Sequence, residues 1–187
     1  MEEGVWPQSV ESWLNAAEEE IARLPPKVAD LRTAEQFILC NTRLWWSAEA
    51  SGSPCAKALV RNGFTAANLP RGAHDSFERF LMILSSAALV RPQIGSTARR
   101  DLGADEARLL RAVSLCQEGY SCNAAMVLKN WLPPTAIRVA LRSLTAFSIL
   151  AAMEGLVLPL RSLVSPGVPA GVPAGAAETA PPREMMH

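Results

Sequence analysis

Residues 134–155 read PTAIRVALRSLTAFSILAAMEG, and this stretch decides the fold. Its apolar side chains recur at intervals of three and four residues, the spacing of one face of an α-helix. Proline opens the segment and Gly155 closes it, which is usual at helix ends. Arg138, Arg142 and Thr145 fall outside the apolar face. The stretch therefore predicts a long helix with an inner face of Ile137, Ala140, Leu141, Leu144, Phe147 and Ala151.

Residues 31–50 predict a second central helix. Thr33 is followed by Ala34, Glu35 and Gln36, a capping-box pattern in which the hydroxyl and the Gln side chain each satisfy an end amide. Apolar side chains then surround most of the helical cylinder, so neighbouring helices should cover it on several sides. These side chains are Phe37, Ile38, Leu39, Leu44, Trp45 and Trp46.

A first, amphipathic helix is expected over about residues 10–24, with Ser9 as its cap. Its apolar residues form one stripe, while Glu18, Glu19 and Glu20 lie largely off that stripe. Pro25 and Pro26 end the helix, because proline disfavours helical backbone in the residue before it. The stripe consists of Val10, Trp13, Leu14, Ala17, Ile21 and Leu24.

The rest of the chain also favours helices, and strand patterns are nearly absent. The sequence predicts an all-α, single-domain irregular helical bundle of about six to seven helices, with a disordered C-terminal tail. Residues 1–8 are expected to be an N-terminal extension, residues 9–163 the helical domain, and residues 164–187 a Pro/Gly/Ala-rich disordered tail. Shorter helices are expected from Pro54 to before Gly63, from about 75 to 88, over 104–116 and over 121–131.

Composition excludes two broad classes. The chain has 187 residues, of which 49% are hydrophobic, and its 18 basic residues balance 18 acidic ones. A fully disordered chain would have fewer apolar residues and a larger net charge. A protein that binds polyanions by bulk charge would be strongly basic.

A homodimer that forms through apolar helical faces is a further possibility that the sequence leaves open.

The chain is expected to be cytoplasmic and bacterial-like. The longest uncharged stretch within a predicted helix, from Ser143 to Met153, has eleven residues. A transmembrane helix needs about 20, so no transmembrane segment is predicted. The acidic start, Met1-Glu2-Glu3-Gly4, lacks the basic region of a signal peptide.

No catalytic residue, metal site or cofactor is predicted. The sequence contains no G-x-S-x-G, HExxH, P-loop or GxGxxG pattern. His74 is the only internal histidine and is expected to be solvated or to cap a helix. The carboxylates of Asp105 and Glu106 are expected to be solvated, where nothing would adapt them for acid–base work.

Four cysteines leave open a redox or metal sensor. Cys40 and Cys116 lie at helical spacing among apolar residues and are expected in the core. Cys55 and Cys122 fall in the first turns of predicted helices, where free amides and the helix dipole favour a thiolate. These two are the candidate reactive thiols. Their sequence spacing does not resemble that of a structural zinc site.

An Arg-rich nucleic-acid-binding regulator is the other alternative. Nine basic and five acidic residues lie between Lys57 and Arg111, and residues 104–131 have a helix-turn-helix outline. The second helix, however, is mostly apolar with one cation, so it should be buried and nucleic-acid binding is disfavoured. The arginines concerned are Arg91, Arg99, Arg100, Arg108 and Arg111.

The main functional hypothesis is a non-catalytic, cytosolic protein–protein interaction or regulatory module. Its partner would be another protein or a second copy of the chain, and a small-molecule ligand is unknown. The adjacent Trp45 and Trp46 point about 100° apart, so both are buried only if the helix is enclosed on two sides; an exposed ring would mark a partner surface. The candidate partner surface comprises Trp45, Trp46, Arg91, Arg99 and Arg100.

Overall fold

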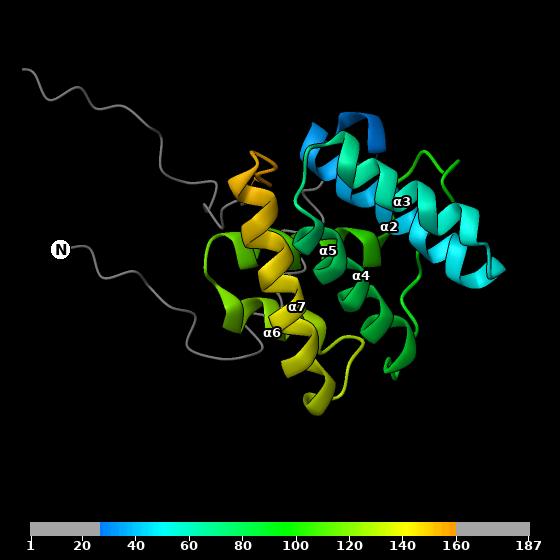
Figure 1. Cartoon of the computed structure of the whole chain (residues 1–187). Coiled ribbons are helices and arrows are strands. Elements are labelled where there is room, and N and C mark those ends of the chain that lie inside the picture. Colours follow the sequence, from blue (N-terminus) through cyan, green and yellow to red (C-terminus); the bar gives the residue numbers. More distant parts are fainter. Residues whose placement is uncertain (1–26, 160–187) are drawn as a thin grey trace, which may run out of the picture.

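A computed structural model describes residues 27–159 as a bundle of helices (Figure 1). A short 3-10 turn, η1 (Val28–Asp30), precedes the α-helices, and no strand occurs in residues 27–159 apart from one bridge between Lys27 and Asp101. The all-α prediction is confirmed. The helices are α2 (Thr33–Ser51), α3 (Pro54–Ala66), α4 (Arg71–Ser86), α5 (Ala104–Gln117), α6 (Ser121–Leu128) and α7 (Pro134–Met153).

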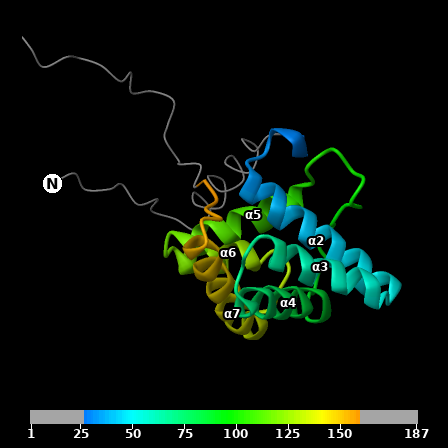
Figure 2. The same cartoon turned by 45° about the horizontal axis from the view of Figure 1, so that its top comes forward.

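The predicted helix over residues 10–24, the extension 1–8 and the tail 164–187 lie outside the described residues. In two views of the bundle, the first described residues (blue) and the last (orange) lie at the same end of the molecule (Figures 1 and 2). That end also holds the C-terminus of α7.

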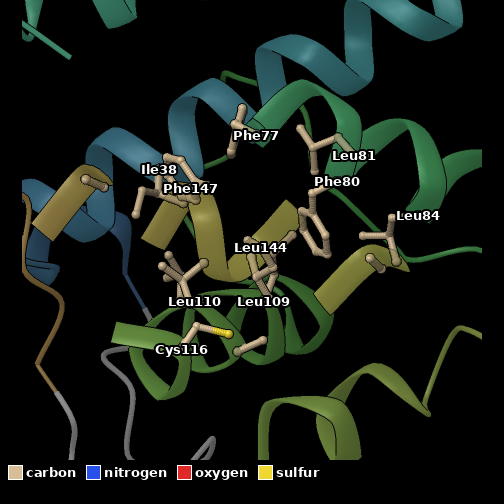
Figure 3. Close-up of a cluster of buried hydrophobic side chains, with 14 of the residues drawn as sticks. Ile38, Phe77, Phe80, Leu81, Leu84, Leu109, Leu110, Cys116, Leu144 and Phe147 are labelled. Carbon is tan, nitrogen blue, oxygen red and sulfur yellow. The ribbon is translucent and has the colours of Figure 1, made fainter. Parts of the chain in front are cut away.

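The core forms where α7 packs against α4 and α5. Leu144 and Phe147 of α7 are fully buried, and the Phe147 ring lies 5.0 Å from the ring of Phe77 on α4. Figure 3 shows α4, α5 and α7 directing side chains toward one another. The three- and four-residue spacing seen in the sequence therefore becomes the central packing interface.

Helix α2 is covered on nearly all sides, as its apolar pattern predicted. Only Thr33, Cys40, Ser47 and residues 49–51 at its C-terminal end are exposed, and the first three lie on one line along the helix. Both tryptophans are buried because α3, α4 and α5 all pack against α2.

The N-terminal cap of α2 differs from the prediction. The cap is Arg32, whose backbone N–H donates to Glu35 Oε2 at 2.8 Å. Gln36 does not satisfy an end amide; its Nε2 donates backward to the carbonyls of Val28, Ala29 and Leu31. The amide side chain thus organises the turn before the helix.

Helix α3 continues through Gly63 to Ala66, so the expected end at Gly63 is wrong. Gly63 is instead a point of close approach to α2, because a Cβ there would lie 3.0 Å from Asn41 Oδ1. Helix α6 ends at Leu128 and is therefore shorter than the helix predicted over residues 121–131.

A buried ion pair joins α2 to α5. Arg43 and Glu106 are 2% and 1% exposed, and two parallel hydrogen bonds of 2.7 Å link the guanidinium to the carboxylate. Arg43 also donates to the carbonyls of Arg99 and Asp101, and Glu106 accepts the amides of Gly95 and Gly103. The expectation of a solvated Glu106 is wrong, because the pair and the 91–103 loop enclose it.

The surroundings of Glu106 lower the pKa of its carboxyl. Burial by itself raises that pKa, but hydrogen bonds from Arg43, Gly103 and Gly95 and the charge of Arg43 outweigh burial. The charged form is therefore favoured in the folded protein.

Replacing Arg43 with Met should lower the free energy of unfolding by about 3–5 kcal/mol, because it leaves the Glu106 charge buried without its partner. Urea denaturation followed by circular dichroism measures this loss. Lys57→Ala is the control, since the Lys57–Glu49 pair is about half exposed and such pairs contribute about 1 kcal/mol or less. Equal losses in the two variants would contradict a structural role for the buried pair.

Acidification should destabilise the wild type through Glu106. Because its pKa is lower in the folded state, the stabilisation is present above the ordinary carboxyl pKa and is lost as pH falls through the folded value. Glu106→Gln should be less stable at neutral pH and lose less further stability on acidification. Urea midpoints across pH 7 to 3 test this, and parallel curves for the two proteins would refute it.

Candidate functional site

One face of α7 is not covered by any described element. Val139, Arg142, Ala146, Ile149 and Met153 follow one another at intervals of three and four residues and are all exposed. Val139 is 53%, Ile149 49% and Met153 74% exposed, which is unusual for large apolar side chains aligned on one helix face. These five residues, with Arg138 beside them, are called the α7 outer face.

A shallow groove of about 550 Å³ lies between the α7 outer face and the start of α6, and it shares Arg138, Arg142, Ala146 and Ile149 with that face. Apolar atoms of Leu141, Ala146 and Ile149 line it, and arginines border one end. An elongated groove along a helix, with a small residue near its middle, accommodates a second helix better than a compact ligand. The lining residues are Ser121, Arg138, Leu141, Arg142, Thr145, Ala146 and Ile149.

The charge of this face is positive and unbalanced. Arg138 and Arg142 are one turn apart, and α7 contains no acidic residue. Neither arginine forms an ion pair within residues 27–159. An acidic ligand would therefore gain two guanidinium contacts.

By length and composition, α7 is also long and apolar enough to cross a membrane. The core helix of a bundle meets the same criteria, and the inner face of α7 is packed against α4 and α5.

A second depression lies between α3 and α4. It encloses about 340 Å³ and is lined by Arg61, Phe64, Thr65, Leu69, Arg71, His74, Asp75 and Glu78. His74 is 6% exposed; its ring centroid lies 5.4 Å from that of Phe64 in an edge-to-face arrangement, and its Nδ1 lies 3.3 Å from Asp75 Oδ1. The prediction of a solvated or capping histidine is wrong, because His74 is the fourth residue of α4 and faces α3.

This depression does not assemble the groups of a nucleophilic site. The only hydroxyl in its lining, that of Thr65, donates to the Arg61 carbonyl within its own helix. Its acids and bases are exposed apart from His74 and the half-buried Glu78. No group of three or more His, Cys, Asp or Glu side chains in residues 27–159 could hold a metal ion.

The residues of the candidate partner surface do not form one exposed patch. Trp45 and Trp46 are 1% and 8% exposed, so neither ring is offered to a partner. Arg91 is exposed and lies over the Trp46 ring at 6.0 Å from its centroid. Arg99 and Arg100 are exposed on the same loop, whose path is fixed through the Arg99 carbonyl by Arg43.

The arginines of the nucleic-acid hypothesis make different contacts and do not form one basic surface. Arg108 donates to Asp105 at 2.9 Å, so its charge is partly neutralised. The second helix of the helix-turn-helix outline, α6, has Ala124, Val127 and Leu128 buried against the core. Within its bounds, Ser121–Leu128, α6 has no basic side chain with which to contact phosphate.

The thiols lie in different parts of the bundle. Cys55 and Cys122 are exposed in the first turns of α3 and α6, as expected. Helix α3 packs against α2 and α4, whereas α6 packs against α5 and α7. Cys40 is exposed on the open line of α2, so its predicted core position is wrong. Cys116 is buried as predicted.

Alkylation of the native protein should distinguish three reactive cysteines from one protected cysteine. Cys40, Cys55 and Cys122 should react readily with iodoacetamide, and Cys116 should react only on unfolding, since burial shields it and raises the pKa of its thiol. Mass spectrometry of timed digests reads each site. Rapid native labelling of Cys116 would contradict the described packing.

Comparisons with known proteins found no match to a protein-family model, a curated protein or a solved structure. The function is therefore argued from the surface of the molecule itself. Sequence reasoning had placed Arg138 and Arg142 on the outside of this helix, but it had not combined them with Val139, Ile149 and Met153. The three- and four-residue spacing of Val139, Arg142, Ala146, Ile149 and Met153 is the signal that identifies this face.

Proposed function

We propose that this protein is a non-catalytic, cytosolic helical interaction module that binds an acidic amphipathic helix on the α7 outer face. The observation that carries this proposal is the exposed stripe of Val139, Ile149 and Met153 beside two arginines that lack acidic partners in residues 27–159. Apolar contact would provide affinity, and the arginines would select acidic over basic helices.

The energetics favour a helix-sized partner. Burying a large aliphatic side chain contributes about 1.5–3 kcal/mol, so three aligned side chains give a substantial but not irreversible interaction. Ala146 near the middle of the face allows close approach of a second backbone. The inner face of α7 is fixed by the core, so the outer face is presented without a folding cost.

The binding test uses a designed probe. This is a fluorescent 15-residue helical peptide with leucines on one stripe and glutamates beside it. The protein is the full chain carrying Leu14→Asp and Ile21→Asp, so that its own acidic N-terminal segment cannot compete. Fluorescence anisotropy should show saturable binding that weakens as salt increases, because exposed charges are screened.

Reversing the two arginines, Arg138→Glu with Arg142→Glu, should weaken probe binding by about tenfold or more. The matched control is Arg61→Glu with Arg71→Glu, which changes the same charge on the exposed rim of the α3–α4 depression. Circular dichroism should show that all variants remain folded. Absence of binding, or equal affinity for the parent and the α7 variant, would contradict the proposed function.

A further inference from the structure

The sequence and the structure together point to an occupant for the α7 outer face. Resting on the proposed function, we infer that the chain's own N-terminal segment, residues 9–24, occupies this face and competes there with partner helices. The inference rests on apolar spacing, length, charge and the place where the described chain begins.

The stripes on the two helices have similar spacing. On α7 the exposed residues Val139, Arg142, Ala146, Ile149 and Met153 are separated by three, four, three and four residues. In the segment, Val10, Trp13, Ala17, Ile21 and Leu24 are separated by three, four, four and three. Aligned in parallel, Val10 meets Val139, Ala17 meets Ala146, and Leu24 meets Met153. The two small residues then fall opposite each other, where helices can approach most closely.

The lengths agree as well. Each stripe extends over 15 residues, from Val10 to Leu24 and from Val139 to Met153. At a rise of 1.5 Å per residue, each is about 21 Å long. One helix therefore covers the other from end to end.

The charges are complementary. Residues 9–24 contain four glutamates and one arginine, whereas α7 contains two arginines and no acid. In the parallel register Glu11 falls beside Arg138 and Arg142, and the Trp13 ring lies at the level of Arg142. Ion pairing and a cation–π contact are therefore both available to this arginine.

The chain enters from the required end. The first described residues (blue) and the C-terminal end of α7 lie at the same end of the molecule (Figures 1 and 2). Only Pro25 and Pro26 separate Leu24 from Lys27, and three peptide steps reach at most about 11 Å. A helix that precedes Lys27 and lies along α7 from this end would therefore run parallel to α7.

A second copy of the chain is the competing occupant. Two α7 outer faces packed symmetrically would bring four arginines into one interface, with Glu154 as the nearest acid on each helix. Like charges disfavour that arrangement. In the parallel register, Glu11 of the N-terminal segment instead lies at the level between Arg138 and Arg142, so that unlike charges meet within one chain.

Photocrosslinking in the full chain identifies the occupant. Benzoylphenylalanine in place of Trp13 should form an adduct within the monomer to residues 139–153. The same group in place of Trp6, outside the stripe, is the control and should not. Arg138→Glu with Arg142→Glu should reduce the Trp13-site adduct several-fold, and adding Glu11→Arg should restore part of it. An adduct only in a dimer band, or one unaffected by the charge changes, would overturn the inference.

The peptide probe separates this inference from the proposed function. With the segment in place, the wild type should bind the probe about tenfold or more weakly than the chain with Leu14→Asp and Ile21→Asp. Equal, tight binding to both chains would overturn the inference and leave the docking surface intact. No binding to either chain would overturn the proposed function.

Discussion

The burial of one face of α7 is the constraint on which the rest of the structure depends. Leu144, Phe147 and Ala151 are completely buried against α4 and α5. These contacts fix the rotation of the helix about its axis, so Val139, Ile149 and Met153 are necessarily turned outward. The same helix therefore supplies both the core and the candidate docking surface.

The Arg43–Glu106 pair serves a different purpose. A buried ion pair contributes little net stability compared with apolar residues of similar shape, because both charges lose their hydration. Its value here is geometric. Through the Arg99 and Asp101 carbonyls and the Gly95 and Gly103 amides, the pair fixes the 91–103 loop against α2 and α5. The α5 helix, which supports α7, is positioned by the same contacts.

Periodicity predicted the helices well because apolar side chains recur along them at helical spacing, in one stripe on α7 and around most of the cylinder on α2. Periodicity did not predict the burial of polar residues whose hydrogen-bond partners are distant in sequence. Arg43 and Glu106 are 63 residues apart, and nothing local marks either as buried. The prediction for Cys40 was wrong in the opposite sense. Although α2 is buried on nearly all sides, Cys40 lies on its one exposed line, with Thr33 and Ser47. A glycine in sequence predicts a helix end, but Gly63 lies inside α3. Its role is to allow close approach to Asn41 of α2, a contact that the local sequence does not reveal.

The candidate site was predictable only in part. The sequence identified the outward arginines of α7 and the amphipathic character of residues 10–24, but not that the two stripes have equal length, similar spacing and opposite charge. To recognise this similarity, one must know which side of α7 is buried in the core. The sequence favoured Trp45 and Trp46 as part of a partner surface, but α3, α4 and α5 pack around them and bury both rings.

Hydroxyl-radical footprinting of methionines tests the central claim most directly. In residues 27–159, Met153 on the α7 outer face is 74% exposed and Met82 on α4 is 54% exposed. If a helical segment occupies the α7 outer face, Met153 should oxidise more slowly than Met82 in the full wild-type chain. It should become the faster of the two when Leu14 and Ile21 are replaced with Asp. Oxidation of Met153 at its full exposed rate in both proteins would contradict the account.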